Sequence, residues 1–167
     1  VGKGVIRRDK AFGMKLLGND IREIEPDFIL EQGLQMVTLK DLLQQSDFIS
    51  INCDLNPTSF HLINAETLKL VNKYAVLINT ARGPIVDENA LINILQNGNL
   101  AGAALDVFEV EPLPITSPLM SMSNVLLAPH NSNSSPQAWE RVHWNTIRNL
   151  LIGLGIDASE LGKFKSN

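Results

Sequence analysis

The chain has 167 residues, of which 44% are hydrophobic and 19% are charged, a composition that suits one globular domain with a sizeable core. Its 14 basic and 18 acidic residues give a formal net charge of -4 without any basic block, so we expect no nucleic-acid partner. The longest apolar runs, such as residues 75–78, are far shorter than the ~20 residues of a bilayer span, so we expect no membrane partner. The single cysteine, Cys53, excludes an internal disulfide and favours a reducing compartment, for which the cytoplasm is the default.

The apolar pattern alternates helical periodicity with short β-branched runs bounded by Gly, Asn, Asp or Pro, which predicts an α/β chain. In chain order the first half predicts a helix over 3–12 closed by Gly13, a strand over 14–17, a less regular segment over 21–34, a short strand over 36–38, a helix over 39–45 and a strand over 48–53. The second half predicts a helix from 64 or 65 to 71, a strand over 75–79, a helix over 87–96 and strands over 101–107 and 125–128.

A last helix is predicted over 136–154, after a proline-rich loop. Its apolar residues fall on or near one stripe, which is typical of a helix that faces a core: Trp139, Val142, Ile147, Leu150, Leu151 and Leu154. The remaining residues, 155–167, are expected to form a polar, frayed tail.

Strands that alternate with helices predict a doubly wound parallel sheet, joined by right-handed crossovers and covered by helices on both faces. In such sheets the ligand lies beyond the carboxyl ends of the strands. Polar residues collect after the predicted strands, at Asp20, 79–83, 106–111 and His130. The sequence therefore predicts a ligand site along that edge.

Each candidate residue also has a simpler structural explanation. Taken alone, Arg82 fits a surface salt bridge as well as an anion site, the acids of 106–111 fit a solvated loop, and His130 fits a structural histidine. An arginine, a carboxylate and a histidine at successive strand ends of one sheet can converge on one crevice, which favours the functional interpretation. His61 and His143 are assigned structural roles.

Several motifs carry a family resemblance: Lys10-Ala11-Phe12-Gly13-Met14, the block 77–91 around NTARGPIVDE, the block 98–112 around AGAALDVFEVEP, and 124–130. On these the chain, from about residue 1 to 154, resembles the cofactor-binding domain of the D-isomer-specific 2-hydroxyacid dehydrogenases, which include phosphoglycerate dehydrogenase and glyoxylate/hydroxypyruvate reductase. The resemblance implies a Rossmann-like NAD-binding domain. It also implies an NAD-dependent oxidoreductase that interconverts a small D-2-hydroxy acid and its 2-keto acid.

The same resemblance assigns the catalytic residues as Arg82, Glu111 and His130. In these roles His130 is the general acid/base, Glu111 orients its imidazole, and Arg82 pairs with the substrate carboxylate. The glutamate of the Glu-Pro pair is the one that matches, so Glu109 is not carried over.

The resemblance further implies that NAD is held by seven residues: Gly2, Asp20, Thr80, Ala81, Arg82, Asp106 and His130. Asp106 would hold the nicotinamide carboxamide. Asp20 would accept from the ribose 2'-hydroxyl and so favour NAD over NADP, with Arg22 close by and with a simple strand-end cap as the alternative.

Alignment on Lys10–Met14 makes Gly2 the third glycine of the family's phosphate-binding turn, which places the other two glycines and the first strand outside this sequence. The N-terminal substrate domain of the family is also missing. Because the first strand lies between the second and the fourth in this fold, we expect exposed strand edges. We also expect the isolated chain to be marginally stable, to bind NAD weakly or not at all, and to be inactive.

The resemblance implies a homodimer, for which the proline-rich loop 112–118 and the apolar last helix are the candidate contacts. The segment Asn131–Ser135 departs from the family pattern beside the expected nicotinamide and substrate, so no particular 2-hydroxy acid is predicted. Two alternatives stay open: a non-catalytic dinucleotide-sensing protein of the corepressor type, and an inactive partial product. Nucleotide-dependent capture of a partner without turnover would favour the first.

Overall fold

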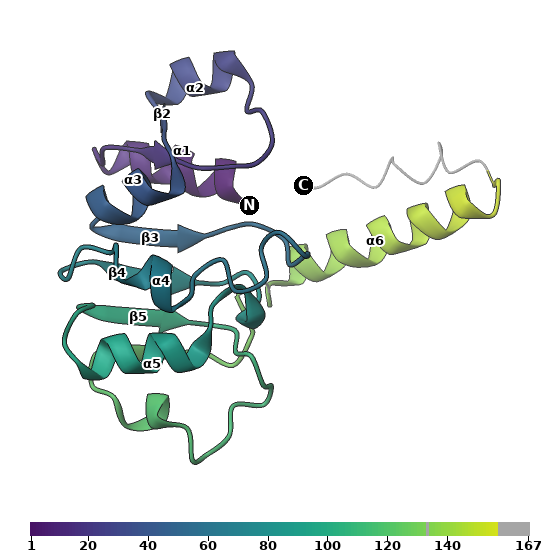
Figure 1. The fold of residues 1–167 in the computed structure, drawn as a ribbon. Helices are drawn as coiled ribbons and strands as arrows, with labels where there is room; N and C mark the ends of the chain where they lie inside the picture. The colour runs from purple at the N-terminus through teal and green to yellow at the C-terminus, as the bar shows by residue number, and fades with distance from the viewer. Residues whose placement is uncertain (133, 157–167) are drawn as a thin grey trace. The chain divides into compact units, whose positions relative to one another are not determined.

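The computed structural model describes residues 1–132 and 134–156 and divides the chain into two units, Val1–His130 and Asn131–Asn167. The elements of the first unit are α1 (Gly2–Ala11), β1 (Leu17–Gly18), α2 (Pro26–Gln32), β2 (Gln35–Met36), α3 (Leu39–Gln45), β3 (Phe48–Ile51), α4 (Ala65–Leu68), β4 (Val76–Asn79), α5 (Glu88–Gln96), β5 (Gly102–Leu105) and β6 (Val125–Leu127), with short 3-10 helices η1 (Gly83–Ile85) and η2 (Pro118–Ser121) (Figure 1). The second unit contains α6 (Pro136–Gly153).

These elements follow the predicted order, with α2 and the short 3-10 helices η1 and η2 as additions. The segment predicted to be irregular contains α2, which begins with Pro26 in its first turn and ends at Gly33 in the left-handed conformation, φ 65°. Proline at a helix start and glycine just past its end are compatible with a helix, because neither removes an intrahelical hydrogen bond there. The strand predicted over 14–17 is shorter than expected and covers only Leu17–Gly18.

All strands pair in parallel, as predicted, but they form two separate sheets. One contains β1 and β2, and the other has the order β3-β4-β5-β6. Among the described residues β1 pairs with β2 alone and β3 with β4 alone, so both strands keep an open edge. The expectation of exposed strand edges is therefore confirmed.

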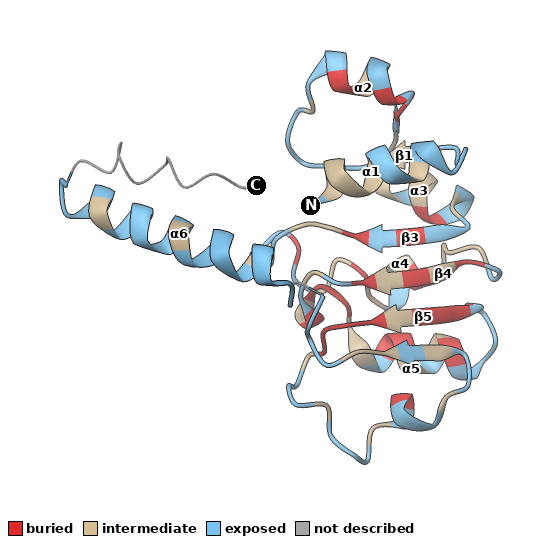
Figure 2. Cartoon of the chain, turned by 180° about the vertical axis from the view of Figure 1, so that it is seen from behind, coloured by how far each residue is buried: buried red, intermediate tan, exposed pale blue. Residues whose placement is uncertain are grey.

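The four-stranded sheet is buried on one face. Ile49, Leu77 and Ala103 lie side by side in register, and all three are at most 4% exposed. On the opposite face Phe48 and Leu126 are 60% and 71% exposed, and within residues 1–130 no helix covers this side of β3–β6 (Figure 2). Helices α4 and α5 both lie on the buried face, because successive right-handed crossovers in one direction place their helices on the same side of a sheet.

The main core lies between the four-stranded sheet and the helices on its buried face. It is built largely from aliphatic side chains, among them Leu43, Leu68, Leu77, Leu91 and Leu100, each at most 2% exposed. A second, smaller cluster packs where α1 and α2 meet the two-stranded sheet, around Leu16, Phe28 and Leu34. The main core fixes the strands whose ends carry the predicted site residues.

Helix α6 starts as its sequence predicts, with Ser135 as the N-cap accepting from the amide of Ala138 and with Pro136 in the first turn. It contains no buried residue, and Trp139, Leu150 and Leu154 are 55%, 61% and 64% exposed. The prediction that its apolar stripe faces a core is wrong for the described residues of this unit, 131–132 and 134–156, because among them α6 meets no second element against which to bury one face. The predicted frayed tail falls largely on residues 157–167, outside the described part of the chain. No described helix is long and apolar enough to cross a membrane.

Candidate active site

The predicted site residues leave the carboxyl ends of neighbouring parallel strands. β4 ends at Asn79, β5 at Leu105 and β6 at Leu127. Asp106 is 4% exposed, and its amide donates to the carbonyl of Asn79 at 3.0 Å, which holds the start of the loop after β5 beside the end of β4. The loops that carry Arg82, Glu111 and His130 therefore start from one edge of one sheet, as the sequence predicts.

A buried asparagine shapes the turn that presents Arg82. Asn79 is 1% exposed; its Oδ1 accepts from the amide of Ala81 at 3.0 Å, and its Nδ2 donates to the carbonyl of Arg82 at 3.0 Å. Thr80 and the Arg82 side chain are exposed, and the guanidinium Nη1 donates to the carbonyl of Ala81 at 2.6 Å. The sequence places Asn79 in the polar run 79–83 at the end of a strand, but it does not predict that this side chain shapes the turn.

Glu111 and His130 form the central contact of the site. Glu111 Oε2 lies 2.8 Å from His130 Nδ1, and Glu111 Oε1 accepts from the amide of Phe108 at 3.0 Å. The hydrogen bond from His130 lowers the pKa of the Glu111 carboxyl; the Phe108 amide and then the charge of Arg82 add smaller effects in the same direction. Because Nδ1 is occupied by Glu111, any proton exchange by His130 falls to Nε2.

The Glu111–His130 pair is accessible from solvent. The side chains of His130 and Glu111 are 42% and 38% exposed, and His130 has a positive φ of 53°. The structure thus brings the three residues that the resemblance assigns to catalysis into one electrostatic neighbourhood, with direct contact between two of them.

The N-terminus of α1 is the candidate position for the cofactor phosphates. No side chain caps this helix and its first turn has no acidic residue, so its amides and its dipole favour an anion. A β-carbon on Gly2 would lie 3.4 Å from Cβ of Asn52, which places the start of α1 beside the segment that follows β3. The absence of a side chain at Gly2 therefore keeps this approach open.

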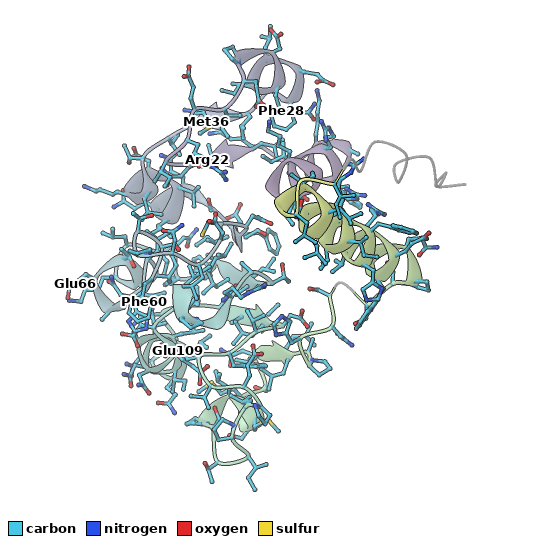
Figure 3. All side chains as sticks on the ribbon, turned by 90° about the vertical axis from the view of Figure 1, so that its right-hand side faces the viewer. Arg22, Phe28, Met36, Phe60, Glu66 and Glu109 are labelled. Carbon is cyan, nitrogen blue, oxygen red and sulfur yellow. The ribbon has the colours of Figure 1, made fainter. Side chains whose placement is uncertain are left out.

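Asp20 lies two residues beyond β1, in a loop anchored by Asn19, whose Nδ2 donates to the carbonyl of Val37 at 2.9 Å. Asp20 Oδ1 accepts from the amide of Arg22 at 2.9 Å and lies 3.7 Å from its Nε. Arg22 extends into solvent near the two-stranded sheet (Figure 3).

Burial raises the pKa of the Cys53 thiol, and the nearby charges of Asp54 and Asp20 add to that rise.

Two residues outside the predicted site, His61 and Glu109, contact each other at the loop after β5. His61 Nε2 lies 2.6 Å from Glu109 Oε1, across 48 residues of sequence. Sequence reasoning gave His61 a structural role and set Glu109 aside. The other histidine with a predicted structural role, His143, packs its ring edge-on against Trp139 within α6, with centroids 5.8 Å apart.

A hollow in the described structure lies away from these residues. It is a groove of about 420 Å³ between α4 and α5, lined by residues such as Leu68, Lys73 and Ile94, and it includes none of the predicted site residues. Within residues 1–132 and 134–156 no group of three or more His, Cys, Asp or Glu side chains is arranged to hold a metal ion.

Residues 1–132 match the model of the D-isomer specific 2-hydroxyacid dehydrogenase NAD binding domain. The chain belongs to this family. The fold agrees, since solved structures of family members superpose on most of the chain.

Among its relatives is a glyoxylate reductase of Korarchaeum cryptofilum, which is 42% identical over 151 residues, 90% of this chain and 45% of the relative. A D-isomer specific 2-hydroxyacid dehydrogenase of Lactobacillus delbrueckii, solved in complex with NAD, has a TM-score of 0.78 at 29% identity over 93% of this chain and 50% of that one. A third, from Xanthobacter autotrophicus, was solved with NADPH and has a TM-score of 0.67 at 39% identity over 72% of this chain and 38% of that one. The chain thus spans about half the length of the proteins it matches.

Proposed function

We propose that this chain is the NAD-binding part of an oxidoreductase that interconverts a small D-2-hydroxy acid and its 2-keto acid. The observation that carries the proposal is the contact of Glu111 with His130 at 2.8 Å, within reach of the charge of Arg82, at the carboxyl edge of a parallel sheet. A histidine held by a carboxylate is suited to moving a proton near neutral pH.

In the proposed reaction each of the three side chains has one task. His130 gives a proton to, or takes it from, the oxygen on C2 of the substrate through Nε2, while Glu111 holds Nδ1 and so keeps the imidazole oriented. Arg82 pairs with the substrate carboxylate through its planar guanidinium and polarises the C2 carbonyl. The nicotinamide cofactor, when bound, supplies or accepts the hydride.

For the cofactor we propose NAD, held by Gly2, Asp20, Asp106 and the turn Thr80–Arg82. The uncapped start of α1 suits the pyrophosphate, and buried Asp106 lies beside that turn. Asp20 would accept from the ribose 2'-hydroxyl and repel a 2'-phosphate, although it already engages Arg22, and relatives bind either NAD or NADPH.

For the substrate we propose a small 2-keto acid of the glyoxylate or hydroxypyruvate class, because curated relatives are glyoxylate reductases and Arg82 offers a guanidinium for the carboxylate. The segment Asn131–Ser135 differs from the usual family pattern and includes Asn133, which is outside the described residues. A panel of keto acids, rather than one compound, is therefore the appropriate probe.

The test is a chimera in which this chain replaces the matching 151 residues of the Korarchaeum reductase, so that the relative supplies the rest of its length. Oxidation of NADH by a panel of 2-keto acids is measured at 340 nm, and the 167-residue chain alone is expected to show none. His130→Ala is expected to lower kcat/KM by at least about 100-fold. His143→Ala removes the same side chain from α6 and is expected to change little. No rate with any keto acid, or an undiminished rate in His130→Ala, overturns the proposal.

We also propose that the active protein is a homodimer. The support is the exposed apolar stripe of α6, in which Trp139, Leu150 and Leu154 are more than half exposed. Sedimentation of the chimera as a monomer contradicts this proposal, and Leu150→Lys is expected to weaken the dimer.

A further inference from the structure

The loop that follows β5 supplies partners for two histidines. Glu111 contacts His130, and Glu109, two residues earlier, contacts His61. The first pair belongs to the site described above. The second pair joins this loop to the segment before α4, and Glu109 and Phe60, the neighbour of His61, are seen close together in Figure 3.

The second pair is well enclosed compared with the first. The side chains of His61 and Glu109 are 32% and 24% exposed, and the ring of Phe60 stacks on the imidazole of His61 with centroids 4.1 Å apart and planes inclined by 17°. The His61 Nε2 to Glu109 Oε1 distance is 2.6 Å. A short contact with limited solvent access holds its partners in one geometry more firmly than an exposed pair does.

Glu109 is also tied to the start of α5 by a reciprocal pair of hydrogen bonds. Its Oε2 accepts from the amide of Glu88 at 3.0 Å, and its own amide donates to Glu88 Oε2 at 3.2 Å. Burial raises the pKa of the Glu88 carboxyl, and the charge of Glu109 adds to the rise. Both carboxylate oxygens of Glu109 are therefore in use, one toward His61 and one toward α5.

His61 is itself fixed by its backbone. Its amide donates to the carbonyl of Pro84 at 2.9 Å, and it has a positive φ of 48°, a conformation that persists only where the surroundings impose it. Pro84 is in η1, the short helix directly after Arg82. His61 thus connects the segment that follows Arg82 to the loop that carries Glu111.

We propose that His61 and Glu109 are positioning residues for the Glu111–His130 pair. They hold the loop 106–112 against η1 and the start of α5, so that Glu111 reaches Nδ1 of His130 while its other oxygen stays on the Phe108 amide. The catalytic meaning of this placement rests on the proposed function. The placement itself is a property of the loop and is measured without turnover.

The test uses Glu109→Gln in the 167-residue chain, read by NMR titration of the Glu111 side-chain carboxyl. Removing a negative charge two residues away would, by electrostatics alone, lower the pKa of Glu111. Displacement of the loop removes the His130 hydrogen bond and raises that pKa toward its ordinary value. The direction of the change therefore separates the two effects.

Hydrogen exchange supplies the second measurement. We expect the Phe108 amide to exchange about tenfold faster or more in Glu109→Gln, while the Leu77 amide in β4 reports the stability of the sheet and stays unchanged. Glu109→Asp keeps the charge but shortens the side chain, and it is expected to show the same upward pKa change. Glu66→Gln removes an exposed carboxylate from α4 and is the matched control.

A rise in the Glu111 pKa together with faster Phe108 exchange supports the proposal. An unchanged or lower Glu111 pKa overturns it, as does equal acceleration at Phe108 and Leu77, which would mark a general structural role. Loss of the folded state in both Glu109 variants also counts against it, since the proposed effect is local. Each result stands whether or not the chimera reduces 2-keto acids.

Discussion

The backbone of Gly83 lies against the carbonyl group of Phe108, so closely that a β-carbon at position 83 would come 1.8 Å from the Phe108 oxygen. Gly83 directly follows Arg82, and the amide of Phe108 donates to Glu111. This contact joins the turn of the predicted substrate-binding arginine to the loop of the predicted carboxylate, and it requires glycine because the neighbouring atoms are backbone.

The first prediction follows from that contact. Gly83→Ala forces the two loops apart and is expected to destabilise the chain by about 2 kcal/mol or more, measured by urea unfolding. Gly4→Ala is the control, because the nearest atom to a β-carbon there is Arg8 Nη1 at 3.5 Å and alanine is favoured in a helix. Equal stability of Gly83→Ala and the unsubstituted chain would show that the loops are not packed as described.

The second prediction concerns the pH dependence of stability. The pKa of Glu111 is lowered from its ordinary value of 4.5 in the folded chain, so the ionised form stabilises the fold. That contribution is fully present above the unfolded-state pKa and is lost as the pH falls through the folded-state pKa. The unfolding free energies of the unsubstituted chain and of Glu111→Gln are therefore expected to differ near neutral pH and to converge as the pH falls below the folded-state pKa of Glu111. A gap that widens on acidification has the wrong sign, and Glu66→Gln controls for loss of one carboxylate.

The third prediction concerns cofactor choice in the chimera. Asp20→Ala removes the proposed acceptor for the ribose 2'-hydroxyl and leaves Arg22 without its carboxylate partner. NAD affinity is expected to fall by about tenfold while NADPH affinity rises, as followed by fluorescence titration. Asp47→Asn, before the amino end of β3, is expected to change neither. Tighter binding of NADPH than of NAD by the unsubstituted chimera would contradict the proposed preference.

The fourth prediction separates charge from shape at Arg82. Arg82→Lys keeps the positive charge but loses the planar fork that pairs with a carboxylate, so kcat/KM of the chimera is expected to fall by roughly 100-fold. Arg141→Lys makes the same change at an exposed arginine of α6 and serves as the control. A rate within a few-fold of the unsubstituted chimera would remove Arg82 from substrate binding.

The sequence by itself determined the element order, the parallel α/β class and the strand ends at which polar residues gather. These properties depend on local spacing: apolar periodicity marks the helices and strands, Asn79 is the last residue of β4, Asp106 directly follows β5, and His130 comes shortly after β6. The family motifs added the roles of Arg82 and Glu111. The sequence did not predict α2, because proline and glycine usually interrupt a helix. Here Pro26 and Gly33 instead mark the start and the end of one.

Only the tertiary structure decided which side chains meet. Glu111 and His130 are 19 residues apart in the sequence, and His61 and Glu109 are 48 apart. Contacts between residues so far apart depend on strand register and loop packing rather than on local pattern. The same holds for the exposed stripe of α6, since a sequence shows that a helix is amphipathic but not whether its own unit provides a surface to cover it. Local pattern specifies elements because backbone hydrogen bonding is local in helices, whereas the site depends on non-local contacts that form only when the sheet is assembled.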